Sequence, residues 1–345
     1  MSGAVRKGYV RGLDIKNGRV DMSHGSGGRA MAQLIEELFA AAFDNEYLRQ
    51  GNDGALLPTA GGRLVMATDA HVVSPLFFPG GDIGCLSVHG TINDVAVMGA
   101  KPLYLAASFI LEEGFPLADL QRIVQSMAAA AREAGVPIVT GDTKVVEQGK
   151  ADGVFITTTG VGAGKVHANA RPGDAILLSG CIGDHGMAVM SRRENLAFDV
   201  PIESDTAALH HLIAAMLESG ADIRCLRDPT RGGLATTLNE IAKQSGVGLT
   251  IEEEAIPVKP VVAAACEFLG LDPLYVANEG KLIAICAAAD AEKLLAAMRE
   301  HPLGAGAAII GAAHADSHHF VQMKTAFGGR RNVDWLAGEQ LPRIC

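Results

Sequence analysis

Five aspartates occupy positions at which carboxylates commonly gather around a ligand. Apolar segments that predict strands lead directly into Asp69, Asp142, Asp184 and Asp228, whereas Asp94 falls within a predicted helix that Gly99 closes. Strand ends that meet helix starts are where α/β folds collect ligands. Several converging carboxylates would hold Mg²⁺, which prefers a few oxygen ligands together with phosphate and water. A single aspartate is more often a helix cap or a turn former, so the prediction rests on the set.

Glycine-rich turns beside these acids favour the binding of an anion. They are SHGSGG at 23–28, GDHG at 183–186 and PTRGG at 229–233, and each precedes a predicted helix. Glycines in such turns let backbone N–H groups approach an anion at a helix N-terminus. No G-K-[ST] triplet follows, so none is a Walker A motif, and none matches the dinucleotide fingerprint. Taken alone, each turn is a weak signal.

Three other side chains could act on a substrate. Lys144 in GDTKVV and Glu279 in ANEGKL lie at loop ends beside apolar segments, where burial would bring a pKa toward neutrality; a solvated side chain in a hairpin is the alternative. Cys345 is the last residue, so it is not a prenylation site, which needs the cysteine four residues from the end. A chance thiol in a frayed tail is the alternative for Cys345.

The remaining histidines and cysteines give little sign of a metal site. His314, His318 and His319 in HADSHHF have no well-spaced partner, so a polar loop is favoured over a metal centre. The other five cysteines include no C-x-x-C pair and lie in apolar or helical contexts, so we expect buried, inert thiols. They are Cys85, Cys181, Cys225, Cys266 and Cys286.

Composition narrows the class of protein. A chain of 345 residues is longer than one hydrophobic core usually supports, so two domains are expected. The net charge of −10 disfavours nucleic acid or an anionic membrane as the main partner. No apolar run approaches a membrane span, and no apolar core follows the basic N-terminus as a signal peptide requires. Scattered cysteines and the absence of such segments predict a cytoplasmic protein.

The elements that must position these residues alternate between strands and helices, which predicts an α/β or α+β protein of two halves. The clearest helix runs from Pro116 to Gly135, with proline near its start and glycine at its end. ANARPGD near residue 170 interrupts the pattern before a new strand. We expect four parts, which are a loose leader over 1–20, an N-terminal domain over 21–170, a C-terminal domain over 171–335 and a mobile tail over 336–345.

Taken together, the motifs resemble the HypE family of hydrogenase maturation proteins, within the aminoimidazole ribonucleotide synthetase-like (PurM-like) superfamily. The resemblance runs from about Val20 to Cys345, and only Ala70 and His71 depart from the usual pattern. Acids and glycine loops are shared across the superfamily and specify only ATP use, whereas a terminal PRIC is specific to the family. The motifs are SHGSGG, TDAHVVSPLFFPGGDIG, NDVAVMGA, FILEEG, IVTGDTKVV, GDHG, RDPTRGG, PVKP, ANEGKL, HPLG and PRIC.

The resemblance implies a PurM-like fold of two α/β domains, the N-terminal one forming a β-barrel across a homodimer, with a flexible tail. It also implies that Cys345 receives a carbamoyl group from a HypF-type carbamoyltransferase. ATP-dependent dehydration would convert this thiocarbamate into a thiocyanate. The cyano group would then pass to iron on a HypC–HypD scaffold complex and become a ligand of the [NiFe]-hydrogenase centre.

Removing water from an amide requires a better leaving group than oxide, and phosphorylation by Mg²⁺–ATP supplies one. By analogy with the superfamily, Asp69, Asp94 and Asp142 are the candidates for Mg²⁺, and Glu279 and Lys144 are the candidates for a base and for orienting the carbamoyl oxygen. The further residues predicted to contact ATP are Asn93, Thr143, Gly25, Gly27, Gly28, Asp184 and Asp228.

Other functions remain open at this point. Selenophosphate synthetase would need a reactive Cys or selenocysteine beside SHGSGG, and aminoimidazole ribonucleotide synthetase or thiamine phosphate kinase would not need Cys345. A non-enzymatic metallochaperone could instead use the tail thiol and the HADSHH histidines. Turnover of ATP by a carbamoylated chain separates these possibilities.

Overall fold

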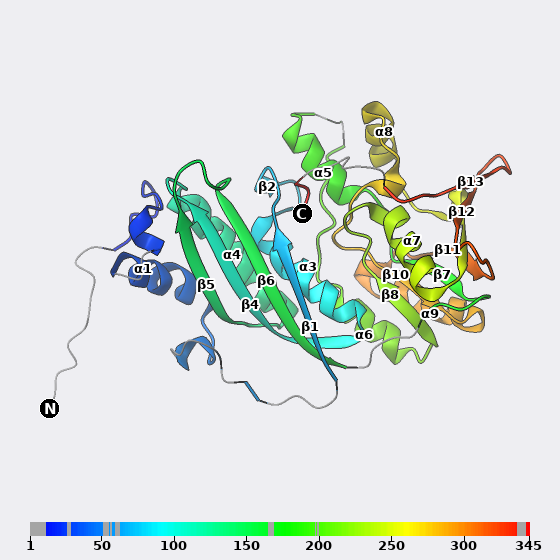
Figure 1. The fold of residues 1–345 in the computed structure, drawn as a ribbon, viewed down its shortest axis with the longest axis horizontal. Helices are drawn as coiled ribbons and strands as arrows, with labels where there is room; N and C mark the ends of the chain where they lie inside the picture. Colours follow the sequence, from blue (N-terminus) through cyan, green and yellow to red (C-terminus); the bar gives the residue numbers. More distant parts are fainter. Residues whose placement is uncertain are drawn as a thin grey trace.

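The computed structural model describes residues 12–25, 29–50, 55, 57–58, 63–164, 169–196, 198, 200–336 and 343–345. Two sheets dominate it, one in each half of the chain (Figure 1). The last residue lies between the halves, close to β2 (Phe77–Phe78) and α3 (Ile83–Val97).

The N-terminal half is a four-stranded sheet with two helices on one face. The strand order is β1-β6-β4-β5, and only the β4–β5 pair is parallel. Helix α3 contacts the sheet on one side and α4 on the other, so nearly all its residues are buried and its sequence is apolar all round. The strands are β1 (Arg63–His71), β4 (Ala100–Glu112), β5 (Ile138–Val146) and β6 (Val154–Gly164), and the second helix is α4 (Leu117–Ala134).

The opposite face of this sheet is open and partly apolar. Burial alternates along β1, and the outward side chains of Leu64 and Met66 are 69% and 73% exposed. Ile110 of β4 lies on the same face, because the register aligns the strands through β6. Exposed apolar side chains on an edge strand mark a surface suited to another polypeptide.

Local signals mark the ends of both helices that cover this sheet. The Asp82 side chain accepts hydrogen bonds from the backbone N–H groups of Gly84 and Cys85 and so starts α3. Gly135 follows α4 in the left-handed conformation, with φ of 67°, as the glycine at the end of the predicted helix requires.

The C-terminal half is a seven-stranded sheet with helices on both faces. β7 and β10 are buried on both sides, with alternate residues pointing to α7 on one face and to α6 and α9 on the other. The strand order is β13-β12-β9-β11-β7-β10-β8. The strands are β7 (Ala175–Leu178), β8 (Ile223–Arg227), β9 (Gly248–Glu252), β10 (Ile283–Cys286), β11 (Ala308–His314), β12 (Val321–Lys324) and β13 (Arg330–Asn332). The helices are α5 (Asp184–Arg193), α6 (His210–Glu218), α7 (Gly233–Ser245), α8 (Pro260–Leu269) and α9 (Ala291–Glu300).

Shorter elements complete the chain. Those before β1 are η1 (Met22–Gly25), α1 (Arg29–Leu34), the π-helix η2 (Ile35–Ala40), α2 (Ala41–Phe43) and η3 (Leu48–Gln50). Those after β1 are β3 (Gly81–Asp82), η4 (Glu253–Ala255), η5 (Pro273–Tyr275), η6 (Ala288–Asp290) and η7 (Pro302–Gly304). Of the helices that the structure describes, none combines the length and apolarity needed to cross a bilayer.

Two strand ends and the leader differ from expectation. β1 continues past Asp69 to His71, and β5 continues past Asp142 to Val146, because the residues that follow keep pairing with neighbouring strands. In the predicted leader, Val20 is buried and its N–H bonds to the carbonyl of Phe115, so this segment is bound to the N-terminal half. Residues 1–11 of the leader lie outside the described residues.

Candidate active site

Four acidic side chains converge where the two halves meet; we call them the acid cluster. Asp69 comes from β1, Asp94 from α3, Asp228 from the turn after β8, and Glu279 from the segment before β10. Burial, together with the charges of Asp228 and Asp69, raises the pKa of Asp94 to about 7. Burial, with the charge of Asp69 adding to it, raises the pKa of Asp228 to about 6. Asp94 and Asp228 therefore resist ionisation beside the other carboxyl groups.

Arg227 and Arg231 are the arginines whose charges act on Asp94, and Arg227 also acts on Asp228. The Arg231 guanidinium lies 4.0 Å from the Asp69 carboxylate, but its side chain is 73% exposed. His71 Nε2 lies 3.3 Å from Asp69 Oδ2, and burial lowers the pKa of this histidine, so its ring is neutral near pH 7. The cluster thus carries more negative charge than its neighbours offset, and it fits a cation.

Mg²⁺ is the cation that this donor set suits. Among the residues that the structure describes, no group of three His, Cys, Asp or Glu side chains is arranged to hold an ion by itself. Mg²⁺ commonly takes one or two carboxylates and completes its shell with water and phosphate. Asp69, Asp94 and Asp228 are the residues that would hold it.

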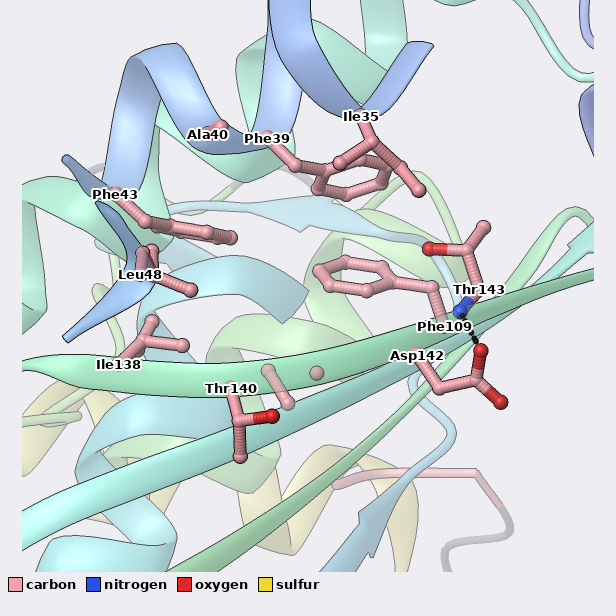
Figure 2. A pocket seen from close by; sticks show the side chains of 12 residues that line it. Ile35, Phe39, Ala40, Phe43, Leu48, Phe109, Ile138, Thr140, Asp142 and Thr143 are labelled. Carbon is pink, nitrogen blue, oxygen red and sulfur yellow. Dashed lines mark hydrogen bonds between the residues drawn. The ribbon is translucent and has the colours of Figure 1, made fainter. Parts of the chain in front are cut away.

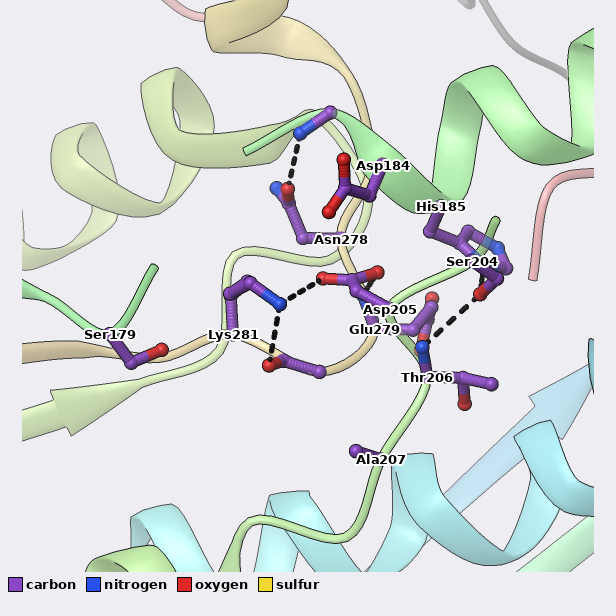
Figure 3. A network of polar contacts seen from close by, with 12 residues as sticks. Ser179, Asp184, His185, Ser204, Asp205, Thr206, Ala207, Asn278, Glu279 and Lys281 are labelled. Carbon is purple, nitrogen blue, oxygen red and sulfur yellow. Dashed lines mark hydrogen bonds and ion pairs between the residues drawn. The ribbon is translucent and has the colours of Figure 1, made fainter. Parts of the chain in front are cut away.

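Glu279 belongs to a network of polar contacts with its neighbours (Figure 3). Its backbone N–H donates to Asp205 Oδ1 at 3.1 Å, and its carbonyl accepts from Asn93 Nδ2 at 3.2 Å. Asp205 in turn forms a buried ion pair with Lys281, at 3.1 Å. A Cβ on Gly280 would lie 1.7 Å from the Asp205 carbonyl oxygen, so only glycine fits there.

The carboxyl group of Glu279 is unusually poor in partners. Its side chain is buried, and Oε1 forms no hydrogen bond with any residue that the structure describes. Burial, reinforced by the charges of Asp205, Asp228 and Asp69, raises the pKa of Glu279 well above its ordinary value. A raised pKa brings a carboxyl group closer to the proton affinity that a general base needs near neutral pH.

Cys345 lies against Glu279. The thiol and the carboxyl group hydrogen-bond, and burial, with the charge of Glu279 adding to it, raises the pKa of Cys345 well above its ordinary value. Arg343 does not offset this, because its guanidinium pairs with Asp152; Arg231 is the cation that acts on the thiol. The raised pKa favours the protonated thiol in the bound tail.

Backbone hydrogen bonds fix the last residues beside β1. The N–H of Val72 donates to Cys345 O at 3.1 Å, and the N–H of Ser74 donates to the Arg343 carbonyl, also at 3.1 Å. Ile344 between them is buried against the N-terminal core. These contacts place the sulfur of Cys345 at the acid cluster of its own chain. The mobility expected for residues 336–345 stays a prediction.

A second group of predicted residues lies around β5; we call Asp142, Thr143, Lys144 and Gly25 the β5 cluster. Asp142 and Lys144 are mostly exposed and pair at 3.1 Å, and Asp142 Oδ1 also accepts from the N–H of Thr143. Gly25 abuts this strand, since a Cβ there would lie 2.7 Å from the backbone nitrogen of Val145. Gly27 and Gly28 lie outside the described residues.

An apolar cavity opens beside the β5 cluster (Figure 2). Its volume is about 130 Å³, and Phe39, Phe43 and Phe109 line it while Asp142 and Thr143 lie at one end. A cavity of about 150 Å³ with similar walls accepts a benzene ring. The cavity therefore has room for part of a planar ring system.

Within one chain the acid cluster and the β5 cluster are apart. Asp69 points to the α3 side of the sheet, whereas Asp142 points to the open side. The register places Lys144 opposite Ile110 and Phe155, so three strand spacings of about 4.8 Å separate it from the edge strand β1. The structure therefore brings Asp69, Asp94, Asp228, Glu279 and Cys345 together and leaves Asp142 and Lys144 elsewhere.

Two predicted nucleotide contacts have other partners here. The Asn93 amide donates to the carbonyls of Ala207 and Glu279 and its oxygen accepts from the N–H of Leu209, so it fixes the loop that carries Glu279. Asp184 is buried at the start of α5 and pairs with Lys259 at 2.8 Å, although Asp184 Oδ1 has no partner among the described residues. These contacts give no support to nucleotide binding by Asn93.

Sequence reasoning missed several residues of the site. Arg231 stood inside the motif PTRGG, which drew attention only for its glycines, and Asp205 and Lys281 carried no local signal because their pairing is long-range. In the loop after β11, Asp316 accepts hydrogen bonds from the N–H groups of His318 and Phe320, which makes this loop a polar turn.

Comparisons with known proteins agree with this geometry. Residues 51–163 match the model of the AIR synthase related protein N-terminal domain, and residues 171–324 match its C-terminal domain. A thiamine monophosphate kinase from Aquifex aeolicus, 16% identical with a TM-score of 0.58, shares the fold over 90% of this chain and 99% of its own. The fold and site thus define an AIR synthase-like protein.

More similar proteins narrow the class. Carbamoyl dehydratase HypE of Cupriavidus necator is 74% identical over 351 residues that span all of both chains, and that of Escherichia coli is 46% identical over 94% of this chain and 99% of its own. A crystal structure of hydrogenase maturation protein HypE in complex with ATP has a TM-score of 0.91 at 51% identity, covering 94% of this chain and 99% of that one. The chain belongs to the HypE family, which confirms the resemblance and the two-domain PurM-like fold.

Proposed function

We propose that this chain dehydrates a carbamoyl group on Cys345 to a thiocyanate with ATP, and so supplies the cyanide ligand of the [NiFe]-hydrogenase iron. The observation that carries the proposal is the position of the terminal thiol against Glu279 inside the acid cluster. Relatives named carbamoyl dehydratase HypE, and the HypE structure in complex with ATP, support it.

The reaction balances as thiocarbamate and ATP giving thiocyanate, ADP and phosphate. The carbamoyl oxygen forms a bond to the γ-phosphorus and displaces ADP, and the C–O bond then breaks as phosphate leaves. The nitrogen loses two protons as the C≡N bond forms. Glu279 is the base placed to accept one of these protons, because its carboxylate binds a proton tightly and lies beside the sulfur.

Mg²⁺ would offset the charge of the transferring phosphoryl group and orient it. Asp69, Asp94 and Asp228 would hold the ion, because these three carboxylates crowd together with little neutralising charge. Asp142 joins this set only if another surface brings β5 close to it.

A homodimer would supply that surface. The open face of the N-terminal sheet exposes Leu64 and Met66, and it also carries Asp142 and Lys144. Burying this face against a second copy, as in the barrel implied by the family, would remove exposed apolar area and bring the β5 cluster to the acid cluster of the other chain. Lys144 could then orient the carbamoyl oxygen, and the apolar cavity beside Asp142 and Thr143 could take the adenine ring.

The tail alternates between two states in this proposal. Bound beside Glu279, the thiol is protonated and buried, so it is a poor nucleophile there. Transfer of a carbamoyl group from a HypF-type enzyme therefore needs the tail to be released, and the length of 336–345 allows this. A crystal structure of a HypE–HypF complex supports that partner, and delivery to a HypC–HypD complex would follow.

The proposed domain limits are 21–170 and 171–335. The proposed location is a reducing cytoplasm, because all six cysteines are free thiols. The bound segment before residue 21 extends the N-terminal domain in this proposal.

Mass spectrometry of the C-terminal peptide tests the function. The purified chain is carbamoylated by a HypF-type enzyme, freed from that enzyme, and mixed with Mg²⁺ and either ATP or a non-hydrolysable analogue. We expect loss of one water mass from the peptide with ATP only. A peptide that keeps the carbamoyl mass while ATP is consumed would contradict the proposal.

A further inference from the structure

The bound tail is held by hydrogen bonds to its main-chain carbonyls as well as by its side chains. In addition to the two bonds from Val72 and Ser74, the guanidinium of Arg193 donates to the Arg343 carbonyl at 2.8 Å, and His185 Nε2 lies 2.8 Å from the Ile344 carbonyl oxygen. Both side chains come from α5 of the C-terminal half. The receiving surface therefore combines one strand extension from the N-terminal half with two side-chain donors from the other half.

The ring of His185 can make this bond in one tautomer only. A carbonyl oxygen only accepts, so Nε2 carries the proton. Burial lowers the pKa of His185 and favours the neutral ring, in which Nδ1 accepts from the Ser204 hydroxyl, 2.8 Å away. The Ser204 oxygen accepts in turn from the N–H of Thr206 (Figure 3). The Phe78 ring meets the imidazole edge-on at 5.4 Å between centroids, so packing and hydrogen bonds both fix the donor.

Arg193 joins the tail to the segment that receives it. Its Nε donates to the Ser74 carbonyl at 2.8 Å, while the same guanidinium donates to the Arg343 carbonyl. That carbonyl also accepts from the N–H of Ser74, so two donors share one oxygen. The planar guanidinium group of an arginine can donate to both carbonyls at once, and the ammonium group of a lysine does not reproduce this geometry.

The backbone conformation of Arg343 is one that requires stabilising contacts. Its φ of 54° is left-handed, which a non-glycine residue adopts only when surrounding contacts compensate. This turn directs Ile344 into the core and Cys345 toward Glu279. Without the donors of α5, the tail would lose the conformation that aims the sulfur.

We propose that His185 and Arg193 are positioning residues, which bind the carbonyls of Ile344 and Arg343 and so hold the reacting sulfur of Cys345 beside Glu279. Both bonds are to main-chain carbonyls, and the Val72 N–H adds a third at Cys345, so three consecutive residues of the tail are held where the sulfur meets Glu279. The role of these residues in the dehydration rests on the proposed function, whereas their binding of the tail does not.

Alkylation of Cys345 in the full-length protein tests the binding of the tail. The rate with iodoacetamide is measured peptide by peptide, with the partly exposed Cys181 as internal reference. Arg193→Met and His185→Phe remove a donor while keeping bulk, His185→Gln keeps an N–H donor, and the exposed Arg192→Met is the matched control on the same helix. Urea unfolding of each variant accompanies the rates.

We expect Cys345 to react about 10-fold faster in Arg193→Met and His185→Phe, with partial rescue in His185→Gln and no change in Arg192→Met. Cys181 should react at the wild-type rate throughout. Unchanged Cys345 rates in both donor variants would overturn the proposal, and so would equal acceleration of Cys345 and Cys181, because general loosening of the fold would then explain it.

The same variants, carbamoylated and given Mg²⁺ and ATP, test the link to the reaction. We expect each donor variant to accept the carbamoyl group normally and to lose water from the tail about 10-fold more slowly than wild type. Dehydration at the wild-type rate would overturn the positioning role. If wild type itself forms no thiocyanate, the proposed function fails, while the alkylation rates still decide whether the tail is held.

Discussion

The acid cluster and the β5 cluster both contain several charged groups. The carboxyl groups of the first are buried and crowded together, whereas the charged groups of the second are exposed and paired. In the acid cluster, buried carboxyl groups face one another, and the pKa of Asp94 and of Glu279 is raised. In the β5 cluster, Asp142 and Lys144 neutralise each other at a surface where both are more than half exposed. The first arrangement stores unfavourable electrostatic energy that a bound cation or a proton relieves, whereas the second stores almost none.

This difference predicts how each region responds to change. Removing a charge from the acid cluster should alter both stability and catalysis, because the charge is buried and unmatched. Removing a charge from the β5 cluster should alter catalysis alone, because the group is already solvated and becomes important only when ATP or a second chain contacts it. The predictions below follow this distinction.

The largest effect is expected for Glu279→Gln. Loss of the base should slow formation of thiocyanate about 10²–10⁴-fold, while the free energy of unfolding stays equal or rises because a buried acid is removed. Time-resolved mass spectrometry of the tail peptide measures the rate. The exposed Glu267→Gln on α8 is the matched control, and a Glu279→Gln rate within a few-fold of it would exclude Glu279 as the base.

Gly280→Ala should destabilise the fold and misplace Glu279. The new Cβ would lie 1.7 Å from the Asp205 carbonyl oxygen, so the backbone must shift, at a cost of about 1–3 kcal/mol in the free energy of unfolding. Urea unfolding measures this cost. Gly306→Ala is the control, because its Cβ would meet only an ordinary contact at 3.7 Å, and equal stability of the two variants would refute the close approach.

Asp94→Asn should stabilise the metal-free chain at high pH. The folded-state pKa of Asp94, about 7, exceeds the ordinary aspartate value of 3.8, so the folded form binds this proton more tightly and loses stability as pH rises from about 4 through about 7. The variant lacks that loss and should gain roughly 1–3 kcal/mol at pH 8 and nothing at pH 4. Urea unfolding in EDTA across this range measures it, and a gain that is independent of pH would disagree.

Lys144→Ala should have the smallest effect on folding. Its ion pair with Asp142 is exposed, so the free energy of unfolding should change by less than about 0.5 kcal/mol. Dehydration of the carbamoylated tail should nevertheless slow about 100-fold or more, if Lys144 orients the oxygen. A stability loss as large as that of Gly280→Ala would remove the distinction between the two clusters.

The elements that the sequence predicted correctly were mostly those with local signals, such as apolar periodicity and helix caps. The helix from Pro116 to Gly135 depends on residues a few positions apart, and the structure places α4 there. Asp94 and Asp228 were assigned correctly to a helix and to a strand end, and the structure brings both to Asp69. These predictions succeeded because apolar periodicity and caps act over one or two turns of chain.

Predictions that depended on contacts between residues far apart in the sequence were less accurate. Asp142 was grouped with Asp69 because each follows an apolar run, but the β-branched residues after Asp142 continue the strand, and the sheet order then puts it three strands away. The α5 donors that hold the tail gave no local signal, because His185 meets Ile344 across 159 positions of sequence. Register between distant strands and the path of a terminus are set by the assembled core, which no short window contains.

The route of the carbamoyl oxygen tests the central claim most directly. The tail is loaded with a carbamoyl group that carries ¹⁸O, Mg²⁺ and ATP are added, and the released phosphate is analysed by mass spectrometry. Phosphorylation of that oxygen predicts one ¹⁸O atom in each phosphate formed together with thiocyanate. Unlabelled phosphate, with the ¹⁸O recovered in water, would contradict the account.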